Sequence, residues 1–360
     1  MSPPALPSHH RAIVQANTDP VTFEISENRP VPVPLDDEIL IKVSAVALNH
    51  CDYKMPGRVP CPGAVNGADY SGTVVRMGKK AELESGLRIG DHVAGAQVAS
   101  SRRAPWAGAF AEYIRHHHSM VWKVPDGWSW EKAAAIGCAT TSTVGMALWI
   151  TLGLTGTPEE PAQEPEFVLV YGGATASGTF AIQLLKLQNF AMVESYGAEK
   201  AFDYHSSTCG EDIRAYTENR LQYVLDIITE ARTIRQCYAA IGRGGGKYCG
   251  FELLPDDLLS TLRKSVKADW TMGLELTGNE VDLPGGYYRA ANPEMHKWFV
   301  LWKQRYVALY DAGKLKPHPI TVREGGLDKV IDGIETMRRR EVSGEKIVYP
   351  LYNNSSKGVV

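Results

Sequence analysis

The chain has 360 residues, of which 44% are hydrophobic, and a formal net charge of -3 at pH 7, which predicts an ordinary protein long enough for two domains. It lacks the basic excess that binding to nucleic acid or to an anionic membrane would favour. The N-terminus has no apolar signal-peptide core and no apolar run approaches a membrane span, so we expect a cytoplasmic protein.

Six cysteines are scattered along the chain, and none belongs to a C-x-x-C pair. They are Cys51, Cys61, Cys138, Cys209, Cys237 and Cys249. This pattern suits free thiols in a reducing compartment better than a disulfide or zinc framework. We therefore expect no disulfide bonds.

Strand-like runs dominate the first part of the chain. Residues 38–46 form a strong strand candidate, and further runs at 69–75, 90–95 and 108–114 are each bounded by glycine. Short strands separated by glycine turns predict a compact, barrel-like β domain.

Helical sequence follows, because Ser129 can cap a helix whose first turns contain three successive alanines. A hydroxyl-rich patch at 140–143 precedes a second apolar helical run to Ile150. The segment 155–166 is rich in proline and glutamate, cannot build a core, and predicts an exposed linker.

The stretch 167–187 has the pattern of a strand, a tight turn and a helix. Residues 168–170 suit a buried parallel strand, and Gly172 and Gly173 allow a turn that larger side chains would block. Small residues at 174–177 would let a pyrophosphate approach the N-terminus of the helix. The complete G-x-G-x-x-G pattern is absent, so an ordinary turn without a ligand remains the alternative.

Further strand candidates at 223–228 and 247–251 alternate with helical sequence, which predicts a parallel sheet. An aromatic helix from Met295 should end near Gly313, where glycine can stop a helix. A short strand at 347–349 closes the ordered pattern.

Six segments now occur in an order typical of one superfamily. They are residues 37–43, 49–54, 67–72, 90–93, 108–113 and 343–346. Together they resemble the medium-chain dehydrogenase/reductase superfamily, and the resemblance is strongest to the fungal trans-acting enoyl reductases of polyketide biosynthesis, of the lovastatin enoyl reductase type. It extends from about residue 10 to 350.

The resemblance implies an α/β protein with a GroES-like β-barrel catalytic domain (1–160), a Rossmann NADPH-binding domain with a doubly wound parallel sheet (161–295) and a return to the catalytic domain (296–360). NADPH would lie in the cleft between the domains. The cofactor-binding residues implied by the resemblance are Cys51, Asp52, Tyr53, Lys54, Ala174, Thr175, Ala176, Ser177, Asn189, Tyr204, Phe251, Glu252, Val342 and Ser343. The implied acyl-substrate residues are Gly137, Cys138, Ala139, Thr140, Thr141, Ser142, Thr143, Val144, Thr271, Met272, Gly273, Leu274 and Glu275.

Hydride transfer from NADPH to an enoyl thioester leaves an enolate, so the site must stabilise charge on oxygen and deliver a proton. Lys54 and Tyr53 are the main catalytic candidates, although a surface lysine is the simpler reading of Lys54. Ser142 and Thr143 can hydrogen-bond the thioester carbonyl or the cofactor amide, although capping a helix would explain them almost equally well. No unique proton donor is visible, and water could serve.

We expect no metal. Cys51 has no partner ligand, because the G-H-E stretch of the zinc-dependent relatives reads Asn66-Gly67-Ala68 here. The three histidines at 116–118 could bind a metal weakly, but next to Arg115 we expect them to lie in a solvated loop.

The second strand of the Rossmann domain is apparently missing. Only Gln188 and Asn189 separate the helix that ends near Leu187 from the next helical sequence at Phe190, whereas a strand with its loops needs about ten residues. We therefore predict either a gene-model or splicing truncation of an active enzyme, or impaired NADPH binding.

The leading hypothesis is a monomeric enoyl reductase that uses NADPH and acts in trans on chains tethered to the acyl carrier protein of a partner polyketide synthase, or of a hybrid with a nonribosomal peptide synthetase. The first alternative is a stand-alone quinone or enal reductase of the same superfamily. The second is a cofactor-impaired, non-catalytic homologue.

Overall fold

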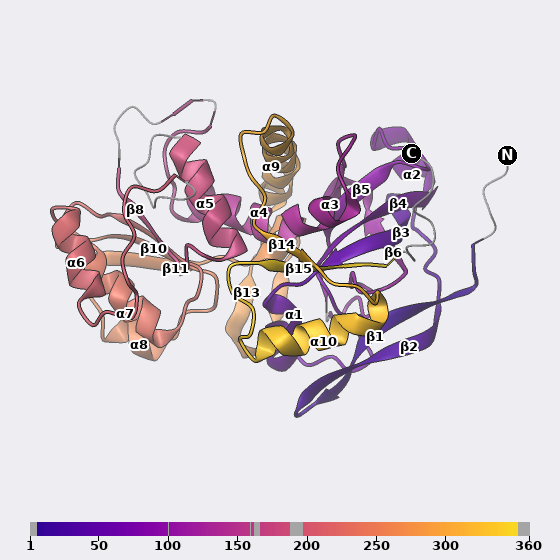
Figure 1. The fold of residues 1–360 in the computed structure, drawn as a ribbon, viewed down its shortest axis with the longest axis horizontal. Helices are drawn as coiled ribbons and strands as arrows, with labels where there is room; N and C mark the ends of the chain where they lie inside the picture. Colours follow the sequence, from indigo (N-terminus) through magenta and orange to yellow (C-terminus); the bar gives the residue numbers. More distant parts are fainter. Residues whose placement is uncertain (1–5, 100, 159, 162–165, 188–196, 352–360) are drawn as a thin grey trace.

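A computed structural model describes residues 6–99, 101–158, 160–161, 166–187 and 197–351. Two sheet-based units lie side by side, and the helices α1 (Cys51–Arg58), α4 (Cys138–Gly145) and α9 (Pro293–Asp311) occupy the region between them (Figure 1). The first unit combines the N-terminal part of the chain with its C-terminal strands, and the second is formed by the middle of the chain.

The first unit is built on a seven-stranded sheet with the order β14-β15-β3-β4-β5-β7, in which β6 also pairs with β3. Its strands are β3 (Glu38–Ala47), β4 (Asp69–Met77), β5 (His92–Ala96), β6 (Tyr113–His117), β7 (Val121–Lys123), β14 (Ile320–Val322) and β15 (Lys346–Pro350). The apolar strand β3 is central and largely buried, as residues 38–46 predicted. Val348 of β15 lies opposite Ala47 of β3, so the end of the described chain completes this sheet.

An antiparallel pair, β1 (His9–Thr18) and β2 (Val21–Pro30), packs on the core of the first unit. The helices α2 (Lys79–Glu84), α3 (Trp130–Ile136) and α10 (Leu327–Arg338) and the turn η1 (His118–Met120) complete this unit. Ser129 caps α3 by accepting a hydrogen bond from the Lys132 backbone N–H, which confirms the predicted helix start.

The second unit contains a four-stranded sheet with the order β11-β10-β9-β8, and all of its pairings are parallel, as predicted. Its strands are β8 (Val168–Tyr171), β9 (Tyr223–Asp226), β10 (Gly246–Gly250) and β11 (Val266–Trp270). Its helices are α5 (Ala176–Leu187), α6 (Cys209–Tyr216), α7 (Ala231–Ala240) and α8 (Asp256–Ser260). The turns η3 (Gly273–Thr277) and η4 (Pro284–Gly286) and the hairpin of β12 (Val281–Leu283) and β13 (Tyr287–Arg289) follow β11.

The edge strand β8 of this sheet lies where the predicted missing strand would pair. Gln188, Asn189 and Phe190 lie outside the described residues. Among the strands that the structure does describe, β8 has a single neighbour, β9. The described strands β8 to β11 therefore form the half of a doubly wound sheet that extends from β8 through β9.

A shared apolar core joins the two units through α9. Phe180 of α5 stacks on Tyr310 of α9 with ring centres 5.9 Å apart, and Trp302 of α9 donates a hydrogen bond to the Thr141 carbonyl of α4. Helix α9 ends at Asp311, and Gly313 has a φ of 69°, as expected of a glycine stop.

The helical segment Trp130–Thr151, which includes η2 (Met146–Thr151), is long and apolar enough to span a membrane by length and composition, but 82% of its apolar window is buried in the protein. It is thus a core helix. The expected linker at 155–166 forms neither helix nor strand in its described residues 155–158, 160–161 and 166.

The prediction of a solvated loop at the three histidines is wrong. His116 and His117 belong to β6, which pairs with β3. His116 is buried, its Nδ1 lies 2.7 Å from the Tyr70 hydroxyl, and burial lowers its pKa to about 3. Tertiary pairing of this polar strand with an apolar one outweighed its composition.

Candidate active site

Residues predicted to bind the nicotinamide end of the cofactor meet where α1 faces the carboxyl ends of the parallel strands. Arg58 of α1 forms an ion pair with Glu252, which follows β10, and the Tyr287 hydroxyl also donates to Glu252. Arg340, beyond α10, lies 3.5 Å from Glu230, the residue that caps α7. Two ion pairs, Arg58–Glu252 and Arg340–Glu230, thus connect the two units.

Lys54 lies within this charged region and is half-buried. Burial and the nearby Arg58 guanidinium lower its pKa, whereas Glu252 and Glu230 act in the opposite direction. The neighbouring Tyr53 is also half-buried, and burial raises its pKa. The surface-lysine alternative for Lys54 therefore does not describe its environment.

Asp52 anchors the start of α1 from inside the protein. Its buried carboxylate accepts hydrogen bonds from the backbone N–H groups of Asn49 (2.7 Å) and Ala68 (3.1 Å), while burial raises its pKa to about 7. Cys51 is exposed, and its Sγ lies 3.9 Å from Asp52. Surrounding protein atoms and the nearby carboxylates of Asp52 and Asp69 raise the pKa of its thiol, which disfavours the thiolate that a metal or a nucleophile would need.

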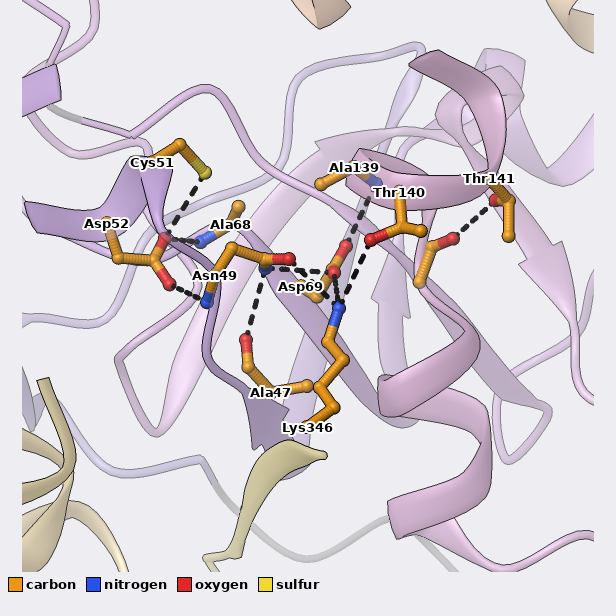
Figure 2. A network of polar contacts seen from close by, with 11 residues as sticks. Ala47, Asn49, Cys51, Asp52, Ala68, Asp69, Ala139, Thr140, Thr141 and Lys346 are labelled. Carbon is orange, nitrogen blue, oxygen red and sulfur yellow. Dashed lines mark hydrogen bonds and ion pairs between the residues drawn. The ribbon is translucent and has the colours of Figure 1, made fainter. Parts of the chain in front are cut away.

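Figure 2 shows a buried network behind this helix, which sequence reasoning missed. The Lys346 ammonium of β15 lies 2.8 Å from the Asp69 carboxylate, 2.9 Å from the Asn49 side-chain oxygen and 3.5 Å from Thr140 Oγ1. Asp69 also accepts hydrogen bonds from Asn49 Nδ2 and the Ala139 N–H, both at 3.0 Å. The ion pair thus joins β15 to β4, and hydrogen bonds from its two side chains reach Asn49 just before α1 and the start of α4. The available signal was a lysine that opens an apolar strand.

The glycine turn after β8 has the close packing that a phosphate loop requires. Gly172 has a φ of 89°, and a Cβ atom at Gly178 would lie 2.3 Å from the Gly172 carbonyl oxygen. Thr175 holds the turn, since its hydroxyl donates to the Gly172 carbonyl at 2.8 Å and accepts from the Gly178 N–H at 3.0 Å. Helix α5 begins at Ala176, so its first backbone N–H groups have no partner within the helix. The glycine cradle and this helix start fit a dinucleotide pyrophosphate.

Tyr204 and Phe251 are two further cofactor-binding predictions that the structure describes. Tyr204 is 49% exposed, its ring centre is 6.3 Å from that of Tyr171 at the end of β8, and the Arg232 guanidinium lies 5.6 Å from the Tyr204 ring. The Phe251 N–H donates to Thr229 Oγ1 at 2.8 Å.

Two predictions concern the loop before β15, and one concerns the segment after α5. Val342 is half-buried on the core of the first unit, and Ser343 is exposed. Asn189 lies outside the described residues.

The two predicted substrate segments contact each other. A Cβ atom at Gly273 of η3 would lie 3.1 Å from Thr143 Oγ1 of α4. The hydroxyls of Ser142 and Thr271, one in each segment, are buried without a hydrogen-bond partner in the described structure. Gly137, with a φ of 39°, opens α4, and a Cβ there would lie 2.3 Å from the Asp69 carboxylate. Among the described residues, no hydrogen bond or ion pair connects Thr143 to Lys54.

No group of three or more His, Cys, Asp or Glu side chains able to hold a metal ion occurs in the part of the chain that the structure describes.

Comparison with known proteins identifies the family. Residues 35–126 match the alcohol dehydrogenase GroES-like domain. The chain is 96% identical over 360 residues, and over the full length of both proteins, to the trans-enoyl reductase pydC of an Acremonium species. It is 73% identical, over 97% of each protein, to the trans-enoyl reductase xenG of Xenoacremonium sinensis. The chain belongs to the trans-enoyl reductase family.

Solved structures agree with this assignment at the level of the fold. This trans-enoyl reductase family member matches the CurK enoyl reductase with a TM-score of 0.71 at 16% identity, over 94% of this chain and 99% of that one. It matches a mycobacterial protein solved in complex with NADPH with the same TM-score at 18% identity, over 95% and 99% of the two chains. The α/β fold with a GroES-like domain is thereby confirmed.

The comparison also bears on the short segment after α5. The alignment with the Acremonium relative covers 360 residues and the full length of both proteins, which leaves no room for an inserted strand in that relative. The short segment is therefore shared with another trans-enoyl reductase.

Proposed function

We propose that this protein is an NADPH-dependent enoyl reductase that reduces the α,β-unsaturated thioester of a chain held on the acyl carrier protein of a partner polyketide synthase. Its 96% identity to a named trans-enoyl reductase over the whole chain carries the proposal. The division of the chain at residues 160 and 295, a cytoplasmic location and a monomeric state remain predictions.

NADPH, when bound, would supply a hydride to the β-carbon of the thioester. The residues at 174–177 and the start of α5 would hold its pyrophosphate, and residues 51–54, Phe251 and Glu252 would border its nicotinamide. Arg232, beside Tyr204, offers a cation for the 2′-phosphate that distinguishes NADPH from NADH.

Lys54 is proposed to stabilise the negative charge that develops on the thioester oxygen. Its half-buried position excludes part of the surrounding water, which strengthens the attraction between an ammonium and an enolate. Its lowered pKa also makes it a better proton donor than an exposed lysine. Thr143 would hydrogen-bond the same oxygen or the cofactor amide, and Tyr53 would line the cleft.

Turnover tests this role. We expect Lys54→Met to lower kcat/KM for a crotonyl-pantetheine thioester about 100-fold, the usual effect of removing one group that stabilises an oxyanion. Lys54→Arg keeps the charge and should retain part of the activity. Equal activity of the Met variant and the wild type would remove Lys54 from the mechanism.

Cofactor titration tests the dinucleotide site independently. We expect the protein to enhance the fluorescence of NADPH on binding, and Arg232→Gln to weaken NADPH about tenfold while leaving NADH unchanged. If neither nucleotide binds and no NADPH is oxidised, the non-catalytic alternative holds.

The choice of substrate separates the two enzymatic readings. The proposed function predicts faster NADPH oxidation with a carrier-bound enoyl thioester than with a free quinone. The reverse order would favour the stand-alone quinone or enal reductase.

A further inference from the structure

A cavity of about 880 Å³ lies beside η3, beyond the residues assigned above to the cofactor. Its walls come from Val59 at the end of α1, from residues 98 and 101–103 after β5, and from η3, β12 and the start of η4. Leu274 is the one lining residue that also belongs to a predicted substrate segment. The volume is within the range of small-molecule sites, about 300 to 1,000 Å³.

Two residues that line the cavity adjoin, along the chain, residues near the proposed reaction centre. Val59 directly follows Arg58, whose guanidinium pairs with Glu252. Leu274 directly follows Gly273, which approaches Thr143 of the other substrate segment. An eight-residue helix is about 12 Å long, so α1 leads from Cys51 to the cavity over a distance that an extended chain can span.

The lining is amphipathic. Its apolar members are Val59, Val98, Leu274, Val281, Leu283 and Pro284. Ser101, Thr277 and Asn279 add hydroxyl and amide groups that can hydrogen-bond single oxygen atoms. Such walls suit a hydrocarbon chain that carries occasional hydroxyl or keto oxygens.

The charges of the lining do not favour an anion. Arg102 donates to the Pro60 carbonyl through Nε at 3.3 Å and Nη2 at 3.2 Å, and Arg103 lies 3.9 Å from Glu280. With Asp282, the cavity has two cations and two carboxylates. Because the lining carries no net charge, it would attract the phosphate of a carrier arm only weakly, so the chain itself is the better occupant.

We propose that this cavity holds the part of the acyl chain distal to the reacting double bond, so that it selects enoyl thioesters by chain length. The inference rests on the proposed enoyl reductase function. It assigns substrate selection to residues 98, 101–103, 277 and 279–284, which lie outside the two predicted substrate segments.

The test compares 2-enoyl pantetheine thioesters of four, eight and twelve carbons. In the wild type, kcat/KM should rise by up to about fourfold for each methylene that the cavity removes from water. Val98→Trp and Leu283→Trp fill the cavity from two different segments of the chain, and each should lower the ratio of kcat/KM for twelve carbons to that for four carbons by more than tenfold. Leu83→Trp, on the exposed helix α2 where Leu83 is 87% exposed, is the matched control and should leave the ratio unchanged.

Each outcome decides between the proposals. If the wild type shows no chain-length preference, or if both tryptophan variants keep the wild-type ratio, the cavity does not hold the chain. If both variants lose activity equally on all three thioesters, the chain-length ratio is unchanged, and the selective role is again refuted. If the wild type turns over a quinone but none of the thioesters, the enoyl reductase function fails, and this inference fails with it.

Discussion

Replacing Lys346 by methionine would test whether the buried network in Figure 2 holds the first unit together. The Lys346 and Asp69 side chains are 3% and 0% exposed, and their charged atoms are 2.8 Å apart. Removing one partner of such a pair leaves an uncompensated buried charge, which costs about 3 to 5 kcal/mol. Two other donors, Asn49 Nδ2 and the Ala139 N–H, still reach the Asp69 carboxylate, so we expect the lower end, about 3 kcal/mol.

Denaturation in guanidinium chloride at pH 7 measures this loss as a change in the free energy of unfolding. Lys329→Met is the matched control, because Lys329 also lies 2.9 Å from a carboxylate, that of Asp332, but the two side chains are 59% and 65% exposed. Its loss should cost less than about 0.5 kcal/mol.

The double variant Lys346→Met with Asp69→Asn identifies the cause. If the buried charge is responsible, removing both charges should recover at least about 1 kcal/mol relative to Lys346→Met alone. A Lys346→Met protein as stable as the wild type would refute the argument. A double variant no more stable than the single one would assign the loss to packing of the lysine stem instead.

Two further predictions concern the phosphate loop and the start of α1. Gly178→Ala would place a Cβ 2.3 Å from the Gly172 carbonyl oxygen, so we expect NADPH affinity in a fluorescence titration to fall more than tenfold, whereas Gly244→Ala, where nothing lies within 4 Å, should bind normally. Burial raises the pKa of Asp52 to about 7, above the ordinary value of about 3.9, so the folded protein keeps a proton that the unfolded chain releases and the wild type loses stability as pH rises from about 4 to 7. Asp52→Asn lacks this titration and should gain up to about 4 kcal/mol relative to the wild type across that window; an equal difference in urea unfolding at pH 4 and pH 8 would contradict the assignment.

The sequence by itself determined the features that depend on neighbouring residues. The apolar run of β3, the cap of α3 at Ser129 and the glycine turn between β8 and α5 were all predictable, because backbone sterics and local hydrogen bonds fix them within a few residues. The resemblance predicted the family, and the 96% identity to a trans-enoyl reductase over the full length of both proteins confirmed it.

Only the tertiary structure decided how distant polar groups are paired. Lys346 and Asp69 are 277 positions apart, and nothing local to either residue identifies its partner. The composition around the histidines of β6 predicted a solvated loop, but the pairing of β6 with β3 buries His116. The cavity beside η3 likewise has walls from three separate segments. Local sequence sets backbone conformation, whereas the pairing of buried charges and the shape of a cavity depend on which segments the completed fold brings together.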